Sequence, residues 1–185
     1  MYSVRTLIPA LLLLAVISGA LAMWYDTLKI NATIETGYVK VKFSSWGCSD
    51  TGPDPQAGGY HNTEGKDVSV CSVTVGREDE GGNPVKLLVT INNAYPGYSV
   101  KVEFTVDNIG TIPVKLYGYE LSGVDGSALS VSLVKPEDTQ IDAGEESGIY
   151  ELNITVLQTA GESSTYTFEL TLTFAQWNEV HGEVY

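Results

Sequence analysis

Few side chains in this sequence could support catalysis or bind a metal, and they are far apart. The two histidines are His61 and His181. Neither belongs to a His-Glu-x-x-His motif, which would place two imidazoles and a general base on one helix face. The sequence also has no Gly-x-Ser-x-Gly nucleophile motif and no phosphate-binding loop. We therefore expect no catalytic residue, no metal ligand and no cofactor, and we interpret both histidines as exposed.

Acidic residues occur in three short clusters, Glu78-Asp79-Glu80, Glu137-Asp138 and Glu145-Glu146. Their hard oxygen ligands could bind calcium, but no segment has the ligand spacing of a calcium loop. We expect solvated surface charge, and a chelator that lowered the melting temperature would indicate calcium instead.

The two cysteines, Cys48 and Cys71, flank a segment rich in Gly, Asp and Pro. A disulfide is the expected state in an exported chain. Closing a loop of about 24 residues would stabilise the fold by roughly 3 kcal/mol. A metal site is the alternative, although two thiols and distant histidines are few ligands for zinc.

Two sequons could accept N-linked glycans. They are Asn31-Ala32-Thr33 and Asn153-Ile154-Thr155, and each has the hydroxyl two residues after the asparagine that the modification requires. Both triplets lie in strand-like patterns, in which neighbouring side chains point to opposite faces. We expect Asn31 and Asn153 to face outward, with apolar neighbours facing inward.

The N-terminus resembles a secretory signal peptide over residues 1–22. Arg5 precedes an apolar run over residues 7–21, and a small-x-small site predicts cleavage between Ala22 and Met23. An uncleaved anchor is the alternative, because the apolar run extends to Tyr25 and a membrane span needs about 20 residues. A type IV pilin, cleaved before its apolar segment, is another. We expect a secreted, extracellular protein that contacts the membrane only through this leader.

Residues 23–35 follow the predicted cleavage site and have the period of a half-buried β-strand. The polar residues Lys29 and Glu35 occupy odd positions. The apolar residues at even positions are Trp24, Leu28, Ile30, Ala32 and Ile34. A strand of this kind must pair, either with its own sheet through a turn at residues 35–37 or with another copy.

The overall composition is acidic, with 10 Lys and Arg against 23 Asp and Glu and a net charge of −13. This charge repels phosphate, so nucleic acid is not expected as a partner. The length after the leader is that of one domain.

Nine runs of β-branched and aromatic residues, separated by Gly, Pro and Asn turns, predict an all-β sandwich. They span residues 28–34, 38–45, 68–75, 85–93, 100–106, 114–122, 128–134, 149–157 and 166–174. Alternation within the runs predicts the following core residues: Val39, Val41, Phe43, Val100, Val102, Phe104, Val106, Tyr166, Phe168, Leu170, Leu172 and Phe174.

Residues 47–66 form the longest segment without a strand pattern and indicate an exposed insertion held by the disulfide. Four aromatic residues could serve as contact platforms, although packing is the simpler role for most of them. They are Trp46, Tyr60, Trp177 and Tyr185.

Three sets of motifs together resemble the TasA and camelysin family of secreted matrix fibre proteins, and in particular archaeal bundling pilins. The first is Asn93-Ala94-Tyr95-Pro96-Gly97-Tyr98-Ser99, followed by residues 102–106, Asn108 and Gly110-Thr111-Ile112-Pro113-Val114. The second is the leader continuing into residues 22–28, and the third is Phe174-Ala175-Gln176-Trp177-Asn178. The resemblance implies a single jelly-roll-like β-sandwich that polymerises into extracellular filaments by donor-strand exchange.

From these observations we expect a non-enzymatic filament subunit, of a pilus or biofilm-matrix fibre. Residues 1–22 would be the signal peptide, 23–35 the donor strand and 36–185 the sandwich, with 47–66 as the insertion. Its partner would be itself, in a head-to-tail homopolymer with possible lateral bundling through the insertion. One alternative is a monomeric secreted adhesin of the same fold. The other is a camelysin-like metalloprotease.

Overall fold

The computed structural model describes residues 7–9, 11–15, 29–30, 32–50 and 68–180. It divides the chain into two compact units, Met1–Glu35 and Thr36–Tyr185. Several sites predicted above lie outside the described residues. They are the cleavage site Ala22–Met23, the donor-strand positions Trp24 and Leu28, the sequon residue Asn31, and both His61 and His181.

The described residues of the larger unit form nine strands. They are β1 (Val41–Asp50), β2 (Val70–Glu78), β3 (Pro84–Ala94), β4 (Ser99–Asn108), β5 (Val114–Ser122), β6 (Leu129–Val134), β7 (Gln140–Ile141), β8 (Tyr150–Val156) and β9 (Ser164–Gln176). The eight sequence runs predicted between residues 38 and 174 each correspond to one of these strands.

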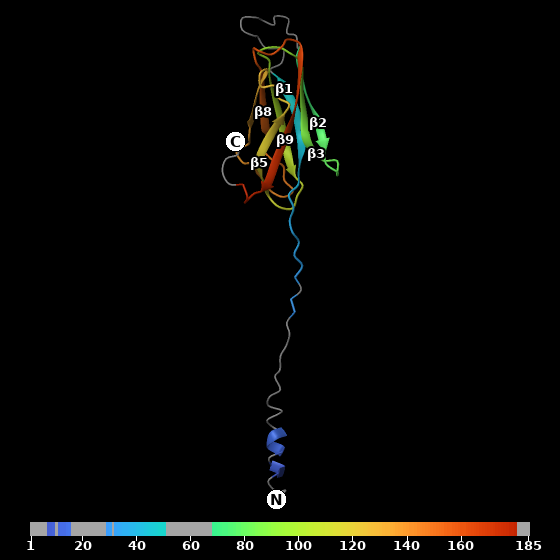
Figure 1. Cartoon of the computed structure of the whole chain (residues 1–185), viewed down its shortest axis with the longest axis vertical. Coiled ribbons are helices and arrows are strands. Elements are labelled where there is room, and N and C mark those ends of the chain that lie inside the picture. Colours follow the sequence, from blue (N-terminus) through green and yellow to red (C-terminus); the bar gives the residue numbers. More distant parts are fainter. Residues whose placement is uncertain (1–6, 10, 16–28, 31, 51–67, 181–185) are drawn as a thin grey trace. The chain divides into compact units, whose positions relative to one another are not determined.

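The strands form two antiparallel sheets packed as a sandwich (Figure 1), which confirms the predicted fold class. One sheet has the order β1-β4-β8-β6 and the other β2-β3-β9-β5-β7. Only β2 and β3 are both consecutive in sequence and adjacent in a sheet, so every other connection crosses from one sheet to the other. In these orders, β1 and β2 are each an edge strand of their own sheet.

The core fills the space between the sheets, and the period of two places its residues there. Along β4 the even positions Val100, Val102, Phe104 and Val106 are all buried, as predicted. The largest fully buried side chains of the core come from both sheets and from the turn before β4. They are Tyr98, Tyr150, Phe104 and Phe168.

The first strand begins and ends later than the sequence predicts. Val39, predicted as a core residue, is 40% exposed, because residues 38–40 hydrogen-bond to a turn instead of joining the sheet. At the other end β1 continues through Gly47 to Asp50, which pairs with Val100. The predicted insertion over residues 47–66 therefore begins inside a strand, and its remaining residues lie outside the described chain.

The structure also contains a strand that the sequence pattern does not predict. β7 has two residues, Gln140 and Ile141, which pair with Lys115 and Val114 of β5. A two-residue strand is too short to show a period in the sequence. Its contact with the core is made by the buried Ile141.

In the smaller unit, residues 7–9 and 11–15 are helical. Among the described residues no helix is both long enough and apolar enough to cross a membrane. Residues 29, 30 and 32–35 belong to no strand, although the sequence predicts one there. Ile30 and Ile34 are 83% and 86% exposed. A strand pattern becomes a strand only when a neighbouring strand accepts its backbone hydrogen bonds.

Candidate functional site

The edge strands β1 and β2 face each other along one side of the sandwich. A disulfide joins them at one end of this side. Cys48 lies in β1 and Cys71 in β2, with their Cα atoms 6.0 Å apart, and the bond predicted from the sequence is formed. Because each strand is the edge of a different sheet, the bond joins the two sheets covalently.

The other end of the same side is hollowed into an apolar groove, with a cavity volume of about 190 Å³. Both sheets line it, with residues of β1, β2, β3, β4 and β9. The lining residues are Val41, Lys42, Phe43, Arg77, Pro84, Val85, Val106, Thr171, Leu172 and Phe174. We call this cavity the inter-sheet groove.

The inter-sheet groove lies where the edge strands lose their regular register. β1 has a bulge between Phe43 and Trp46, and β2 has two irregularities between Val75 and Glu78. A bulge bends its strand and increases the local twist. Leu172 and Phe174, which the sequence predicts to face the core, are consequently only partly buried.

The segment before β1 is fixed to a turn beside the groove. The Tyr38 amide donates to Thr111 Oγ1 at 3.0 Å. The amides of Thr111 and Ile109 donate to the carbonyls of Tyr38 and Lys40 at 3.1 and 2.9 Å. A Cβ on Gly110 would lie 2.5 Å from the Tyr38 carbonyl oxygen, so only glycine permits this approach. We call residues 38–40 the arm root.

Asn108 organises the turn that holds the arm root. Its side chain is 1% exposed, and Nδ2 donates to the carbonyls of Ile112 and Ile141 at 2.9 and 3.0 Å. Its Oδ1 accepts a hydrogen bond from the Gly110 amide at 3.0 Å. These hydrogen bonds offset the cost of burying the amide and define one turn geometry.

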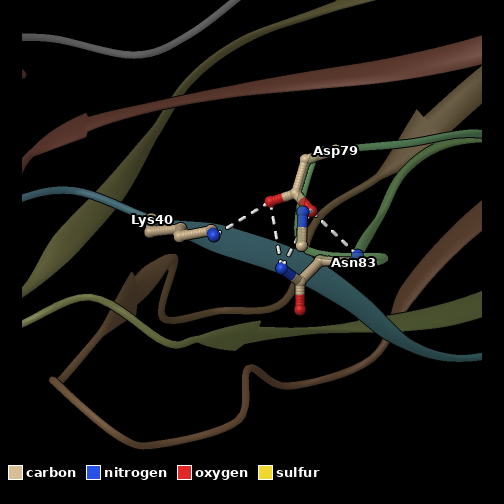
Figure 2. A network of polar contacts seen from close by, with 4 residues as sticks. Lys40, Asp79 and Asn83 are labelled. Atoms are coloured by element: carbon tan, nitrogen blue, oxygen red, sulfur yellow. Dashed lines mark hydrogen bonds and ion pairs between the residues drawn. The ribbon is translucent and has the colours of Figure 1, made fainter.

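A second set of contacts joins the arm root to the β2–β3 hairpin (Figure 2). Asp79 Oδ1 accepts hydrogen bonds from the Gly81 and Asn83 amides at 2.8 and 2.9 Å, and both of its oxygens accept from Asn83 Nδ2 at 3.0 Å. Lys40 Nζ lies 3.0 Å from Asp79 Oδ2. The hydrogen bonds from Asn83, then that from Lys40, hold the pKa of the Asp79 carboxyl far below its usual range.

The Tyr95-Pro96-Gly97-Tyr98 motif lies in the tight turn between β3 and β4. Gly97 has a φ of +91°, and its amide donates to the Val156 carbonyl at 2.9 Å. Tyr98 is fully buried, and its hydroxyl donates to Asp50 Oδ2 at the end of β1 at 2.9 Å. The motif therefore anchors the last residue of β1, on the side of the Cys48 bond.

The remaining predicted residues have ordinary surroundings where they are described. Trp46 packs against the core and Trp177 is 49% exposed. Asn153 lies in β8 between Leu152 and Ile154, both buried, so it faces outward as predicted. Tyr60 and Tyr185 lie outside the described residues. Over the described part of the chain, no group of three metal-binding side chains occurs.

The residues that connect the arm root to the hairpin were not predicted from the sequence. Asp79 was expected only as one member of an acidic cluster, and no role was expected for Lys40. The signal was the spacing of Asp79 and Asn83 across Gly81-Gly82, since an aspartate before a glycine turn accepts hydrogen bonds from the amides that follow. The partnership with Lys40 is long-range and leaves no sequence pattern.

No protein-family model, no curated protein and no solved structure matches this chain. The resemblance to the TasA and camelysin family therefore depends on the quoted motifs alone.

Proposed function

We propose that this protein is the secreted structural subunit of an extracellular filament, and that residues 23–35 of one copy insert into the inter-sheet groove of the next. The observation that carries the proposal is that the chain has two apolar surfaces that the fold leaves incompletely covered. One is the alternating segment with Ile30 and Ile34, and the other is the inter-sheet groove with Leu172 and Phe174.

The inter-sheet groove suits an extended strand as occupant. β1 lines it and is an edge strand, and edge strands offer free N–H and C=O groups to an added strand. Strand addition gives main-chain hydrogen bonds, while alternate side chains of the guest enter the apolar space. An arm with apolar residues at every second position would place all of these residues in the apolar space.

The free energy of the joint between two subunits can be estimated from the apolar side chains that it would bury. Burying two isoleucine side chains such as Ile30 and Ile34 contributes about 3 to 6 kcal/mol, before backbone pairing is included. The donated arm and the receiving groove are different surfaces. A joint between two subunits therefore leaves one subunit with a free arm and the other with a free groove. Head-to-tail contacts of this kind do not close and produce filaments.

The insertion is the proposed site of lateral contact between filaments. Its first four residues form the end of β1 that contains Cys48, whereas the inter-sheet groove lies at the other end of β1. Subunit joints and bundling contacts would then use separate parts of the chain. Deleting the tip of the insertion should leave single filaments intact and abolish bundles, and unaltered bundles would exclude this role.

Electron microscopy of the purified protein starting at Met23 tests the proposal. We expect filaments, and we expect deletion of residues 23–34 to leave folded subunits that do not polymerise. A truncated protein that still forms filaments of normal stability would contradict donation of the arm. A full-length mature chain that remains monomeric would favour the adhesin alternative, and casein hydrolysis that requires zinc would favour the metalloprotease.

A further inference from the structure

The outer face of the β1-β4-β8-β6 sheet has a candidate modification site that does not overlap the inter-sheet groove. Asn153 is in the centre of β8, paired with Lys101 of β4 on one side and Ser132 of β6 on the other. Its side chain is partly exposed, and among the described residues it makes no side-chain hydrogen bond. Asn153-Ile154-Thr155 is also a complete sequon.

The surface beside Asn153 is hollowed, and most of the residues that line the hollow are polar or charged. The hollow has a cavity volume of about 400 Å³, within the range of sites that hold small organic ligands. Lys101 and Glu103 lie on it, and Lys101 Nζ is 3.8 Å from Glu103 and 3.2 Å from Glu151. Such side chains offer both donors and acceptors to sugar hydroxyls.

We propose that Asn153 carries an N-linked glycan whose first sugars lie in this hollow. In the transfer step, Asn153 Nδ2 forms a bond to the anomeric carbon of an oligosaccharide linked to a lipid diphosphate. The bond between that carbon and the diphosphate oxygen breaks, the lipid diphosphate leaves, and the amide nitrogen gives up one proton. The inference does not depend on the proposed filament function.

The modification must precede folding of β8. In the folded sheet the backbone around Asn153 is paired on both sides, and the Thr155 and Ser99 hydroxyls are hydrogen-bonded at 3.1 Å. A transferase that recognises asparagine and hydroxyl together needs an unpaired, adaptable segment, and β8 is unpaired only before it joins β4 and β6. Folded, unmodified protein should therefore not accept the glycan.

Peptide-level mass spectrometry of the protein secreted by its native cells tests the inference. We expect the peptide containing Asn153 to carry the added mass of a glycan, and an unmodified Asn153 would overturn the proposal. The test is done in an Asn31→Gln background, so that Asn153 is the acceptor of the one remaining sequon.

Two matched variants separate recognition of the sequon from other attachments. Thr155→Ser keeps the hydroxyl and should retain the glycan, whereas Thr155→Ala should lose it completely. A glycan that persists on Thr155→Ala would contradict sequon-dependent transfer. If either variant fails to be secreted, the peptide of the chain with Thr155 intact still decides whether Asn153 is modified.

Discussion

Asp79 in the β2–β3 turn pairs with Lys40 at the arm root, with Nζ and Oδ2 3.0 Å apart. The hairpin that carries Asp79 also supplies Arg77, Pro84 and Val85 to the inter-sheet groove. One ion pair thus connects the segment from which the arm leaves to the hairpin that borders the proposed receiving site. The hydrogen bonds from Asn83 to Asp79 set the shape of that hairpin, and Lys40 adds to them from outside the turn.

The first prediction concerns acid stability. Because the pKa of Asp79 is lowered in the folded protein, its ionised form stabilises the fold at every pH above its unfolded pKa of about 4. This contribution decreases as the pH falls below 4, toward the folded pKa. Urea unfolding between pH 7 and pH 2 should show a smaller loss of stability for Asp79→Asn than for the wild type.

Glu80→Gln is the matched control, because it removes one charge from the same turn at an exposed position. It should follow the wild-type pH dependence. Equal acid sensitivity of Asp79→Asn and the wild type would show that Asp79 does not contribute.

The second prediction concerns the close approach at Gly110. A Cβ there would lie 2.5 Å from the Tyr38 carbonyl oxygen and 2.8 Å from the Lys40 nitrogen. Gly110→Ala should therefore lower the free energy of unfolding by about 1 to 3 kcal/mol, as overpacking does. Gly126→Ala is the control, because no atom lies within 4 Å of the added methyl group. Equal stability of the two variants would mean that the arm root is not held by this turn.

The third prediction concerns the disulfide. Cys48 and Cys71 are separated by 23 residues, and a bond across a loop of this length stabilises by about 2 to 4 kcal/mol. The double variant Cys48→Ala/Cys71→Ala should unfold at a correspondingly lower urea concentration. Wild-type protein unfolded under reducing conditions should behave like the variant. A change smaller than about 1 kcal/mol would contradict the role of the bond in joining the sheets.

The fourth prediction concerns the inter-sheet groove. Leu172→Glu places a carboxylate where an apolar side chain of the arm would enter. The lost burial alone, about 1.5 to 3 kcal/mol, should raise the critical concentration for polymerisation 10- to 150-fold. Because Leu172 is only partly buried, the free subunit should remain folded. Sedimentation of polymer across a concentration series measures the change.

Thr173→Glu is the control for this variant. Thr173 is the next residue of β9 and is exposed, and its side chain points to the opposite face of the sheet. It should polymerise like the wild type. If the two glutamate variants polymerise equally well, the inter-sheet groove does not receive the arm.

Strand periodicity predicted most of the fold. The runs around β4 and β5 match the strands within one or two residues. For β4 the reason is that its inner face is continuously apolar, so a shifted register would expose it. The start of β1 could not be predicted in this way. Tyr38 and Val39 have strand-like side chains, but the backbone groups of Tyr38 and Lys40 are hydrogen-bonded to the Gly110 turn, which is a long-range contact.

The candidate site was predictable only in part. The alternation around Ile30 and Ile34 identifies an apolar face, and the two cysteines identify a covalent link. The inter-sheet groove lies where β1 has one register shift and β2 has two, and each extra residue moves the apolar alternation of its strand by one position. The sequence runs were treated as regular strands, so these shifts were not predicted. Leu172 therefore has the pattern of a core residue while lying partly open in the folded chain.

Mixing two assembly-deficient variants of the mature protein tests the central claim most directly. One variant, Ile30→Asp/Ile34→Asp, has a damaged arm and an intact groove, and the other, Leu172→Glu, has the reverse. If the arm of one copy occupies the groove of another, each variant alone should be monomeric at a protein concentration above the critical concentration of the wild type and below that of either variant. An equimolar mixture should give one-to-one dimers and nothing larger, as measured by analytical ultracentrifugation. A mixture that remains monomeric, or that forms filaments, would contradict the account.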